Sequence, residues 1–293
     1  MNKMKVLVAY DGSSFSDAAL DDLLLAGLPS KAEALVISVS EVISPVVSHA
    51  GLAPAPPSNE ILLLQKNDAI ELAQSAARQI NQYFPDWEVN PQGYASSTVT
   101  EILSKAELWR PDLIVVGSHG RSAMTRFFLG SVTMSVLHGA RCPVRIVRGA
   151  VRKDKTPVRN IIGVDGEPLA TSVVESVARR NWPADAEFRV ITCYGPFSRQ
   201  MDPSVLEPMK FRAEETRNEA ISMLSTAGLN ASGKVLLDDA GHGLMEEAEM
   251  WKADCIFVGA RGLNAFERLL LGSVSSKVAG NAPCSVEVVR YPE

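Results

Sequence analysis

The chain of 293 residues is long enough for about two domains of roughly 100–200 residues each. Hydrophobic residues make up 46% and charged residues 22% of it, a balance typical of ordinary globular proteins and not of disordered chains. The net charge is −5 with both signs interspersed, so no Lys/Arg run predicts binding to nucleic acid or to an anionic membrane surface.

The N-terminal apolar run ends at Asp11, which is too short for a signal peptide and predicts a buried strand. No uninterrupted apolar run reaches the roughly 18 residues of a transmembrane helix, so we expect a cytoplasmic protein. The cysteines form no C-x-x-C pair and lie in or beside apolar segments, which predicts reduced, buried thiols. They are Cys142, Cys193, Cys255 and Cys284.

In chain order, short apolar runs alternate with longer amphipathic stretches. The first half predicts strands near residues 4–10, 33–40, 88–94, 112–117 and 143–148. It predicts helices near 14–27, 59–83, 97–109 and 131–139. The stretch 44–58 is rich in Pro, Ala and Ser and predicts a long loop, with a shorter counterpart near 195–203.

The second half repeats this plan after a polar, charged stretch at 149–157. Its strands are expected near 159–164, 186–193, 232–238, 254–258 and 285–289. Five segments match in the same order, namely 5–13 with 160–167, 32–40 with 186–194, 111–120 with 253–262, 127–137 with 269–279, and 141–148 with 283–290. This order indicates duplication of a whole domain, and we expect the two domains at 1–150 and 157–293.

Continuously apolar runs such as 113–116 predict strands that are buried on both faces, as in a parallel sheet covered by helices. Strands that alternate with helices imply right-handed βαβ units. We therefore predict an α/β fold of two tandem doubly wound (Rossmann-like) domains, each with a five-stranded parallel sheet flanked by helices.

A glycine motif follows the fourth predicted strand of each half. Its pattern is G-x-x-G-x9-G-[ST], formed by Gly117, Gly120, Gly130 and Ser131 in the first half and by Gly259, Gly262, Gly272 and Ser273 in the second. Parallel sheets place ligands at the carboxyl ends of strands, and glycines let backbone N–H groups point inward without a Cβ in the way. Because a helix N-terminus follows, the motif predicts anion binding, with Arg121 as a further positive charge.

Simpler interpretations stay open at this point. The glycines could only form tight turns, and Ser131 could only cap the next helix. Asp11 and Asp165 end the first strand of each half, where a carboxylate can accept hydrogen bonds from a ribose or base. An isolated Asp at that place is more often a helix N-cap. No His or second carboxylate is tied to either Asp by spacing, so neither is predicted to be a general base.

These residues resemble the universal stress protein family in its tandem-domain form, over almost the whole chain. The most specific parts are GSHGRSAMTRFFLGSVT at 117–133 and CPV at 142–144, with GARGLNAFERLLLGSVS at 259–275 as the second copy. They are similar to the subgroup that binds ATP. The resemblance therefore implies ATP as the ligand, with or without Mg²⁺, and it implies no further metal site and no catalytic residue.

Matching by position, the resemblance implies nucleotide contacts at Asp11, Gly12, Val39, Gly117, Ser118, Gly120, Arg121, Gly130, Ser131, Val132 and Thr133. The corresponding residues of the second half are Asp165, Cys193, Gly259, Gly262, Gly272, Ser273, Val274 and Ser275. Asp11 and the backbone of Val39 would contact adenine or ribose, and the glycine motif would hold ribose and phosphates. Glu167 stands where the first half has Ser13, and it would repel phosphate, so we expect the first site to be the tighter one.

We expect a nucleotide-dependent binding or regulatory module of the stress response rather than a high-turnover enzyme. The alternatives are a slow ATPase or nucleotidyl-transfer enzyme, and a scaffold that has lost its nucleotide. His119 is the only candidate for a general base. We expect it to face solvent, and the second half has Arg261 in its place. His49, His138 and His242 show no metal-ligand spacing among themselves, so we expect ordinary surface or partly buried residues.

The resemblance also implies how the halves meet. Family members dimerise through their fifth strands, and a tandem chain can pair 144–148 with 286–290 internally. Arg145 then stands opposite Glu287, and we predict that the two side chains lie close across a pseudo-two-fold axis. We also expect that exchanging the two charges restores part of what Glu287→Arg loses; the alternative is that both residues face solvent. Beyond this, we expect a homodimer of tandem chains and an unknown protein partner, with no nucleic acid and no membrane.

Overall fold

The structure is a computed structural model. It describes residues 3–41, 58–120, 129–149, 151–152, 157–166, 168–195, 202–260 and 271–290. The loop expected at 44–58 lies outside these ranges except for Ser58, and so does the stretch 196–201 of its second-half counterpart.

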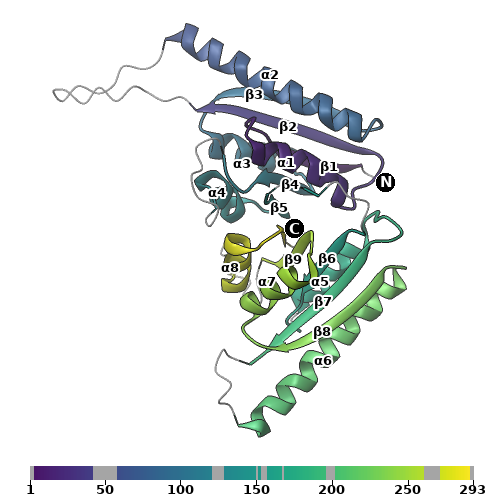
Figure 1. The fold of residues 1–293 in the computed structure, drawn as a ribbon. Coiled ribbons are helices and arrows are strands. Elements are labelled where there is room, and N and C mark those ends of the chain that lie inside the picture. Colours follow the sequence, from purple (N-terminus) through teal and green to yellow (C-terminus); the bar gives the residue numbers. More distant parts are fainter. Residues whose placement is uncertain are drawn as a thin grey trace, which may run out of the picture.

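The described strands form one 10-stranded sheet in the order β3-β2-β1-β4-β5-β10-β9-β6-β7-β8 (Figure 1). The first half supplies β1 (Met4–Ala9), β2 (Ala32–Glu41), β3 (Glu88–Ser96), β4 (Leu113–Gly117) and β5 (Val144–Val147). The second half supplies β6 (Arg159–Gly163), β7 (Glu187–Tyr194), β8 (Asn230–Leu237), β9 (Cys255–Gly259) and β10 (Ser285–Val289). Strands are parallel within each half, which confirms the predicted α/β fold of two tandem doubly wound units.

Helices cover both faces of the sheet. The first half has α1 (Ser14–Asp22), α2 (Asn59–Tyr83), α3 (Thr98–Trp109) and α4 (Ser131–Gly139). The second has α5 (Pro168–Ala178), α6 (Pro203–Thr226), α7 (Ala240–Trp251) and α8 (Ser273–Asn281). Helices α1 and α2 share a buried apolar cluster with one face of β1, whereas α3 and α4 share another with its opposite face. The second cluster continues through β5 and β10 into α7 and α8, so the halves have one common core on that side.

Helix α2 illustrates how the sequence determines this packing. Its buried positions follow helical spacing, and most of them are alanines: Ala69, Ala73, Ala76, Ala77 and Ile80. Such small side chains let the helix lie close to the sheet. A Cβ on Gly93 of β3 would lie 2.2 Å from the backbone nitrogen of Ile70, so only glycine permits this approach.

The helix expected over 14–27 is shorter than predicted. It ends at Asp22 and is followed by a 3-10 turn, η1 (Leu23–Leu25). Gly27 then adopts a φ of +62°, and a Cβ there would lie 2.6 Å from the ring of Trp182 in the other half. The amide of Asn181 also donates to the carbonyl of Gly27 at 2.9 Å. The turn after the helix thus packs against the second half, and a local pattern could not predict this contact.

The two halves join through the antiparallel pair β5 and β10, in the middle of the molecule in Figure 1. Arg145 lies directly opposite Glu287, and Nη1 of Arg145 is 3.3 Å from Oε2 of Glu287. The predicted proximity of the two side chains is thus confirmed. Both are 0% exposed, so the alternative that they face solvent is wrong.

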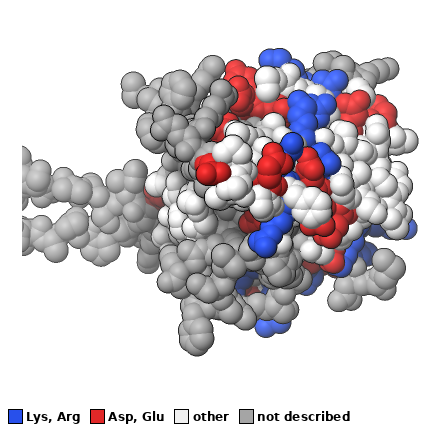
Figure 2. Space-filling view, turned by 90° about the horizontal axis from the view of Figure 1, so that it is seen from below, with Lys and Arg blue, Asp and Glu red and all other residues white. Residues whose placement is uncertain are grey.

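The outer surface carries charges of both signs. Figure 2 shows Lys and Arg side chains interspersed with Asp and Glu, and in this view no area of one sign covers the described residues. No helix among the described residues has the length and hydropathy needed to cross a membrane.

Candidate functional site

An Asp-Gly turn follows the first strand of each half. Gly12 has a φ of +75° and Gly166 a φ of +82°, a backbone conformation that favours glycine. Oδ1 of Asp11 accepts a hydrogen bond from the amide of Ser13 at 3.0 Å. The side chain that caps α1 is that of Ser13, which accepts from the amide of Ser16 at 3.2 Å. The simpler interpretation of Asp11 as the N-cap is therefore wrong.

The glycine motif of the first half ties the start of α4 to the carboxyl end of β4. The amide of Ser118 donates to the carbonyl of Val147 at 2.9 Å, and the amide of Gly130 donates to the carbonyl of Ser118 at 2.8 Å. Oγ1 of Thr133 donates to the carbonyl of Gly117 at 2.7 Å. These three bonds hold the helix N-terminus beside the edge of the sheet.

The second half repeats the same three bonds. The amide of Ala260 donates to the carbonyl of Val289 at 2.8 Å, and the amide of Gly272 donates to the carbonyl of Ala260 at 2.8 Å. Oγ of Ser275 donates to the carbonyl of Gly259 at 2.6 Å. We call this arrangement the glycine frame. It occurs in both halves, so the duplication seen in the sequence extends to the hydrogen bonds.

Both helices that start at a glycine frame lack a side-chain cap. Gly130 and Gly272 are the N-cap residues of α4 and α8, and neither position has a side-chain capping bond. Ser131 and Ser273 are exposed at the first helical position instead, so the interpretation of Ser131 as a helix cap is wrong. Uncapped N-terminal amides with the positive end of the helix dipole are suited to bind an anion.

The glycines of the first frame have different neighbours. A Cβ on Gly120 would lie 3.0 Å from Oδ2 of Asp11, so the loop passes directly beside that carboxylate. A Cβ on Gly117 would lie 2.9 Å from the backbone carbonyl of Phe15. Gly117 is thus required by packing against α1, whereas we expected it to open space for a ligand. Gly120 brings the motif and Asp11 together.

His119 is buried, with 8% of its surface exposed, so the expectation that it faces solvent is wrong. Its ring lies 5.0 Å from the ring of Phe15, and its Nδ1 is 3.0 Å from Oγ of Ser118. His119, which precedes Gly120 in the motif, therefore folds back onto α1 instead of pointing outward.

The remaining predicted residues divide into three groups. Val39 and Cys193 lie half-buried near the carboxyl ends of β2 and β7, and Val132 and Val274 lie half-buried in the first turns of α4 and α8. Asp165 is exposed in its turn. Arg121, Gly262, Glu167, Arg261 and His49 lie outside the described residues.

All four cysteines are free thiols, with Cys255 and Cys284 buried and Cys142 and Cys193 half-buried. Burial raises the pKa of Cys193 to about 12, so its thiol stays protonated beside the second site at neutral pH.

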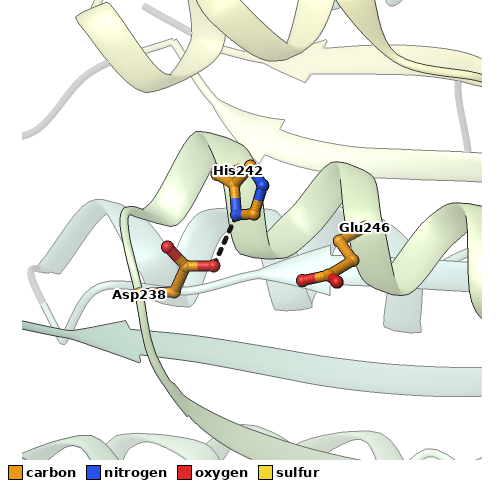
Figure 3. Close-up of side chains that lie close together, drawn as sticks. All are labelled: Asp238, His242 and Glu246. Atoms are coloured by element: carbon orange, nitrogen blue, oxygen red, sulfur yellow. Dashed lines mark hydrogen bonds and ion pairs between the residues drawn. The ribbon is translucent and has the colours of Figure 1, made fainter. Parts of the chain in front are cut away.

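A side-chain cluster at the second half was missed. Asp238, His242 and Glu246 bring their ligand atoms within 4.8 Å of one another at the start of α7 (Figure 3). The spacing among the histidines alone gives no sign of this cluster, and His138 is exposed and bonded to the carbonyl of Met134, as expected of a surface residue. An Asp followed at intervals of four by His and Glu was the signal that could have found it.

Comparisons with known proteins agree with the two repeated units. The model of the universal stress protein family matches residues 3–148 and 158–290. A universal stress protein of Mycolicibacterium smegmatis is 29% identical over an alignment of 301 positions, which covers 97% of this chain and 96% of that one. Another from Methanocaldococcus jannaschii is 32% identical over 148 residues, covering 49% of this chain and 81% of that one.

A solved universal stress protein from Archaeoglobus fulgidus has the same fold along its length. It superposes with a TM-score of 0.67 at 20% identity and covers 98% of both chains. The repeated glycine frames, the duplicated sheet and the double family match lead to one conclusion: this chain belongs to the universal stress protein family, and it contains two copies of the family's domain.

Proposed function

We propose that each half binds one adenine nucleotide, ATP with or without Mg²⁺, and that the chain is a nucleotide-dependent binding or regulatory module of the stress response. The observation that carries this proposal is the glycine frame, which occurs in both halves with an uncapped helix N-terminus. The amides at such a helix N-terminus and the positive end of its dipole are suited to bind the phosphates of a nucleotide.

In the first site, the phosphates would bind the amides at the start of α4, with Ser131 and Arg121 beside them. The ribose and base would contact Asp11 and the backbone of Val39, both at the carboxyl edge of the sheet. In the second site, Asp165, Cys193 and the start of α8 take the same roles. We propose weaker binding there because Glu167 adds a negative charge at the sequence position where the first half has Ser13.

The proposal also includes the domain boundaries and the assembly of the chain. We propose the division at residues 1–150 and 157–293, since the family model matches nearly these ranges. The internal pairing of β5 with β10 already uses the strands that the resemblance assigned to dimerisation. A homodimer of tandem chains would therefore need a different surface, and its presence can be measured by light scattering.

The test is calorimetric titration of the nucleotide-free chain with ATP, with native mass spectrometry to count bound molecules. We expect two sites, the first of them tighter. Gly120→Val should abolish the first site, because the new side chain collides with the Asp11 carboxylate and fills the space beside it. Gly280→Val is the control, since a Cβ at Gly280 in α8 meets no described atom within 4 Å.

Unchanged stoichiometry in Gly120→Val would contradict the assignment of the first site. ATP hydrolysis is the rival activity, and we expect none approaching the roughly 1–10³ s⁻¹ of ordinary enzymes. Turnover in that range, lost in His119→Ala, would replace the binding module with an enzyme.

A further inference from the structure

The residues Asp238, His242 and Glu246 come together because an edge strand leads directly into a helix. Strand β8 ends at Leu237, and α7 starts at Ala240. Asp239 is the N-cap, accepting a hydrogen bond from the amide of His242 at 3.0 Å. With this start fixed, His242 and Glu246 lie one turn apart on the same helix face.

The three side chains have the geometry of a small chelating site. Nδ1 of His242 is 2.6 Å from Oδ2 of Asp238, and one ligand atom of each residue lies within 4.8 Å of the others. Figure 3 shows the Glu246 carboxylate at the level of Asp238, on the next turn from the imidazole. Ligand bonds of about 2.1 Å in a tetrahedral site place donor atoms roughly 3.4 Å apart. An ion bound here would therefore replace the hydrogen bond between His242 and Asp238.

We propose that Asp238, His242 and Glu246 bind one divalent transition-metal ion of the Zn²⁺ type. One imidazole nitrogen favours such ions over Mg²⁺ and Ca²⁺, which prefer oxygen ligands throughout. The two carboxylates balance the double positive charge. Three protein ligands also leave a fourth position open for water or a phosphate oxygen.

A neighbouring cation pairs with the residue next to Asp238. Nζ of Lys277, which reaches over from α8, lies 2.7 Å from Oδ1 of Asp239. Asp239 thus serves as the helix cap and as a partner of Lys277. Its amide donates to Oδ1 of Asp238 at 2.7 Å, while Oδ2 of Asp238 lies against the imidazole of His242.

Among the described residues, the first half has no equivalent of this cluster. Helices α3 and α7 both follow an edge strand and both have 12 residues, so their positions correspond directly. Ser96, Thr100 and Ser104 stand where the second half has the three proposed ligands. We therefore expect one ion per chain, although the fold is duplicated.

The site borders the proposed second nucleotide site. A Cβ on Gly243 would lie 3.0 Å from Sγ of Cys193 and 3.6 Å from Cβ of Asp238, so the two sites are neighbours. The metal proposal does not depend on the nucleotide, because all its ligands belong to the chain. The two proposals can therefore fail separately.

The experiment titrates the full, chelator-treated and nucleotide-free chain with Zn²⁺ alone in a calorimeter. We expect one ion per chain. His242→Ala, Asp238→Asn and Glu246→Gln should each weaken binding at least about tenfold, because losing even an outer-shell partner costs 10–100-fold. His138→Ala and Glu249→Gln are the controls, which remove an exposed imidazole and one charge of α7 from outside the cluster.

Circular dichroism establishes that each variant is folded, and Co²⁺ in place of Zn²⁺ reports nitrogen coordination by its visible absorption. We expect this absorption in the wild type and its loss in His242→Ala. If Zn²⁺ binds equally well to all three ligand variants, or if the controls weaken it as much, the proposed site is wrong. Binding of ATP in the absence of metal tests the nucleotide proposal independently.

Discussion

Packing requires the glycine that ends β4. Gly117 lies where the backbone of Phe15 approaches, and a Cβ would lie 2.9 Å from that carbonyl group. Gly259 ends β9 in the same way, and among the described residues a Cβ there meets Cγ2 of Val173 at an ordinary 3.5 Å. A methyl group at position 117 therefore requires α1 or β4 to move.

This contact predicts the outcome of a substitution. Gly117→Ala should lower the free energy of unfolding by about 1–3 kcal/mol, because the methyl group forces α1 and β4 apart. Gly280→Ala in α8 is the control and should not lower it, because a Cβ there meets no described atom within 4 Å and alanine favours a helix over glycine. Urea unfolding followed by circular dichroism measures both, and equal losses at the two positions would show that the close contact with Phe15 is not decisive.

The site residues illustrate what could be predicted at this scale. The glycine spacing located both frames, because the motif lies within a short stretch of each half. The burial of His119 against Phe15 could not be predicted, since it depends on how the turn after β4 folds back onto a helix distant in sequence. The cluster of Asp238, His242 and Glu246 was in principle visible, but it mixes residue types across the end of a strand and the start of a helix.

Among the elements, the apolar strands and the long helix α2 were predicted well because their signals are local. Helix α2 begins and ends at the predicted residues, with Ser58 as its cap. The prediction for α1 was too long because the chain changes to a 3-10 turn after Asp22. Joining the two sheets through β5 and β10 was expected from family resemblance and charge, and the hydrophobic pattern alone did not indicate it.

Two arginines connect the elements of one half to those of the other. Arg290, just after β10, donates to the carbonyl of Leu137 near the end of α4 at 2.5 Å. Arg148, just after β5, donates in the same way to the carbonyl of Ala279 near the end of α8. Burial lowers the pKa of both arginines, but each keeps its charge at neutral pH and faces the negative end of a helix dipole.

We expect Arg290→Met to lower the free energy of unfolding by about 1.5–3 kcal/mol, the range for hydrogen bonds to charged groups. The buried carbonyl of Leu137 loses its donor, while the apolar part of the side chain is largely kept. Arg179→Met is the control, because its ion pair with Glu175 is exposed and contributes little. Chemical unfolding curves of the two variants should separate. Coincident curves would contradict the role of Arg290 in capping α4 of the other half.

At the scale of the whole molecule, the halves are joined by a buried chain of alternating charges. Asp22 pairs with Arg145, Arg145 with Glu287, and Glu287 with Arg180. Oδ1 of Asp22 also accepts from Oγ of Ser285 at 2.9 Å. Burial lowers the pKa of Arg145, but the two carboxylates raise it more, so the net pKa is raised and the charge is kept.

This alternation gives a reason for duplication within one chain. Two first halves paired by β5 would place Arg145 against its own copy, and two second halves would place Glu287 against its own copy. Only the mixed pair gives charges that alternate along the whole row. The internal interface is therefore specific to the tandem arrangement, as the position of Arg145 opposite Glu287 predicts.

The row of four charges argues against one expectation from the sequence, that adding Arg145→Glu restores part of the stability lost in Glu287→Arg. Glu287→Arg should cost about 3–5 kcal/mol, because it leaves buried charges without partners. Adding Arg145→Glu re-forms the central pair, but it places a carboxylate beside Asp22 and a guanidinium beside Arg180. We therefore expect no recovery in the double variant, whereas the exposed pair Glu175→Arg/Arg179→Glu should unfold like the wild type. Urea unfolding of these variants decides the matter, and substantial recovery in Arg145→Glu/Glu287→Arg would mean that Asp22 and Arg180 are not essential parts of the interface.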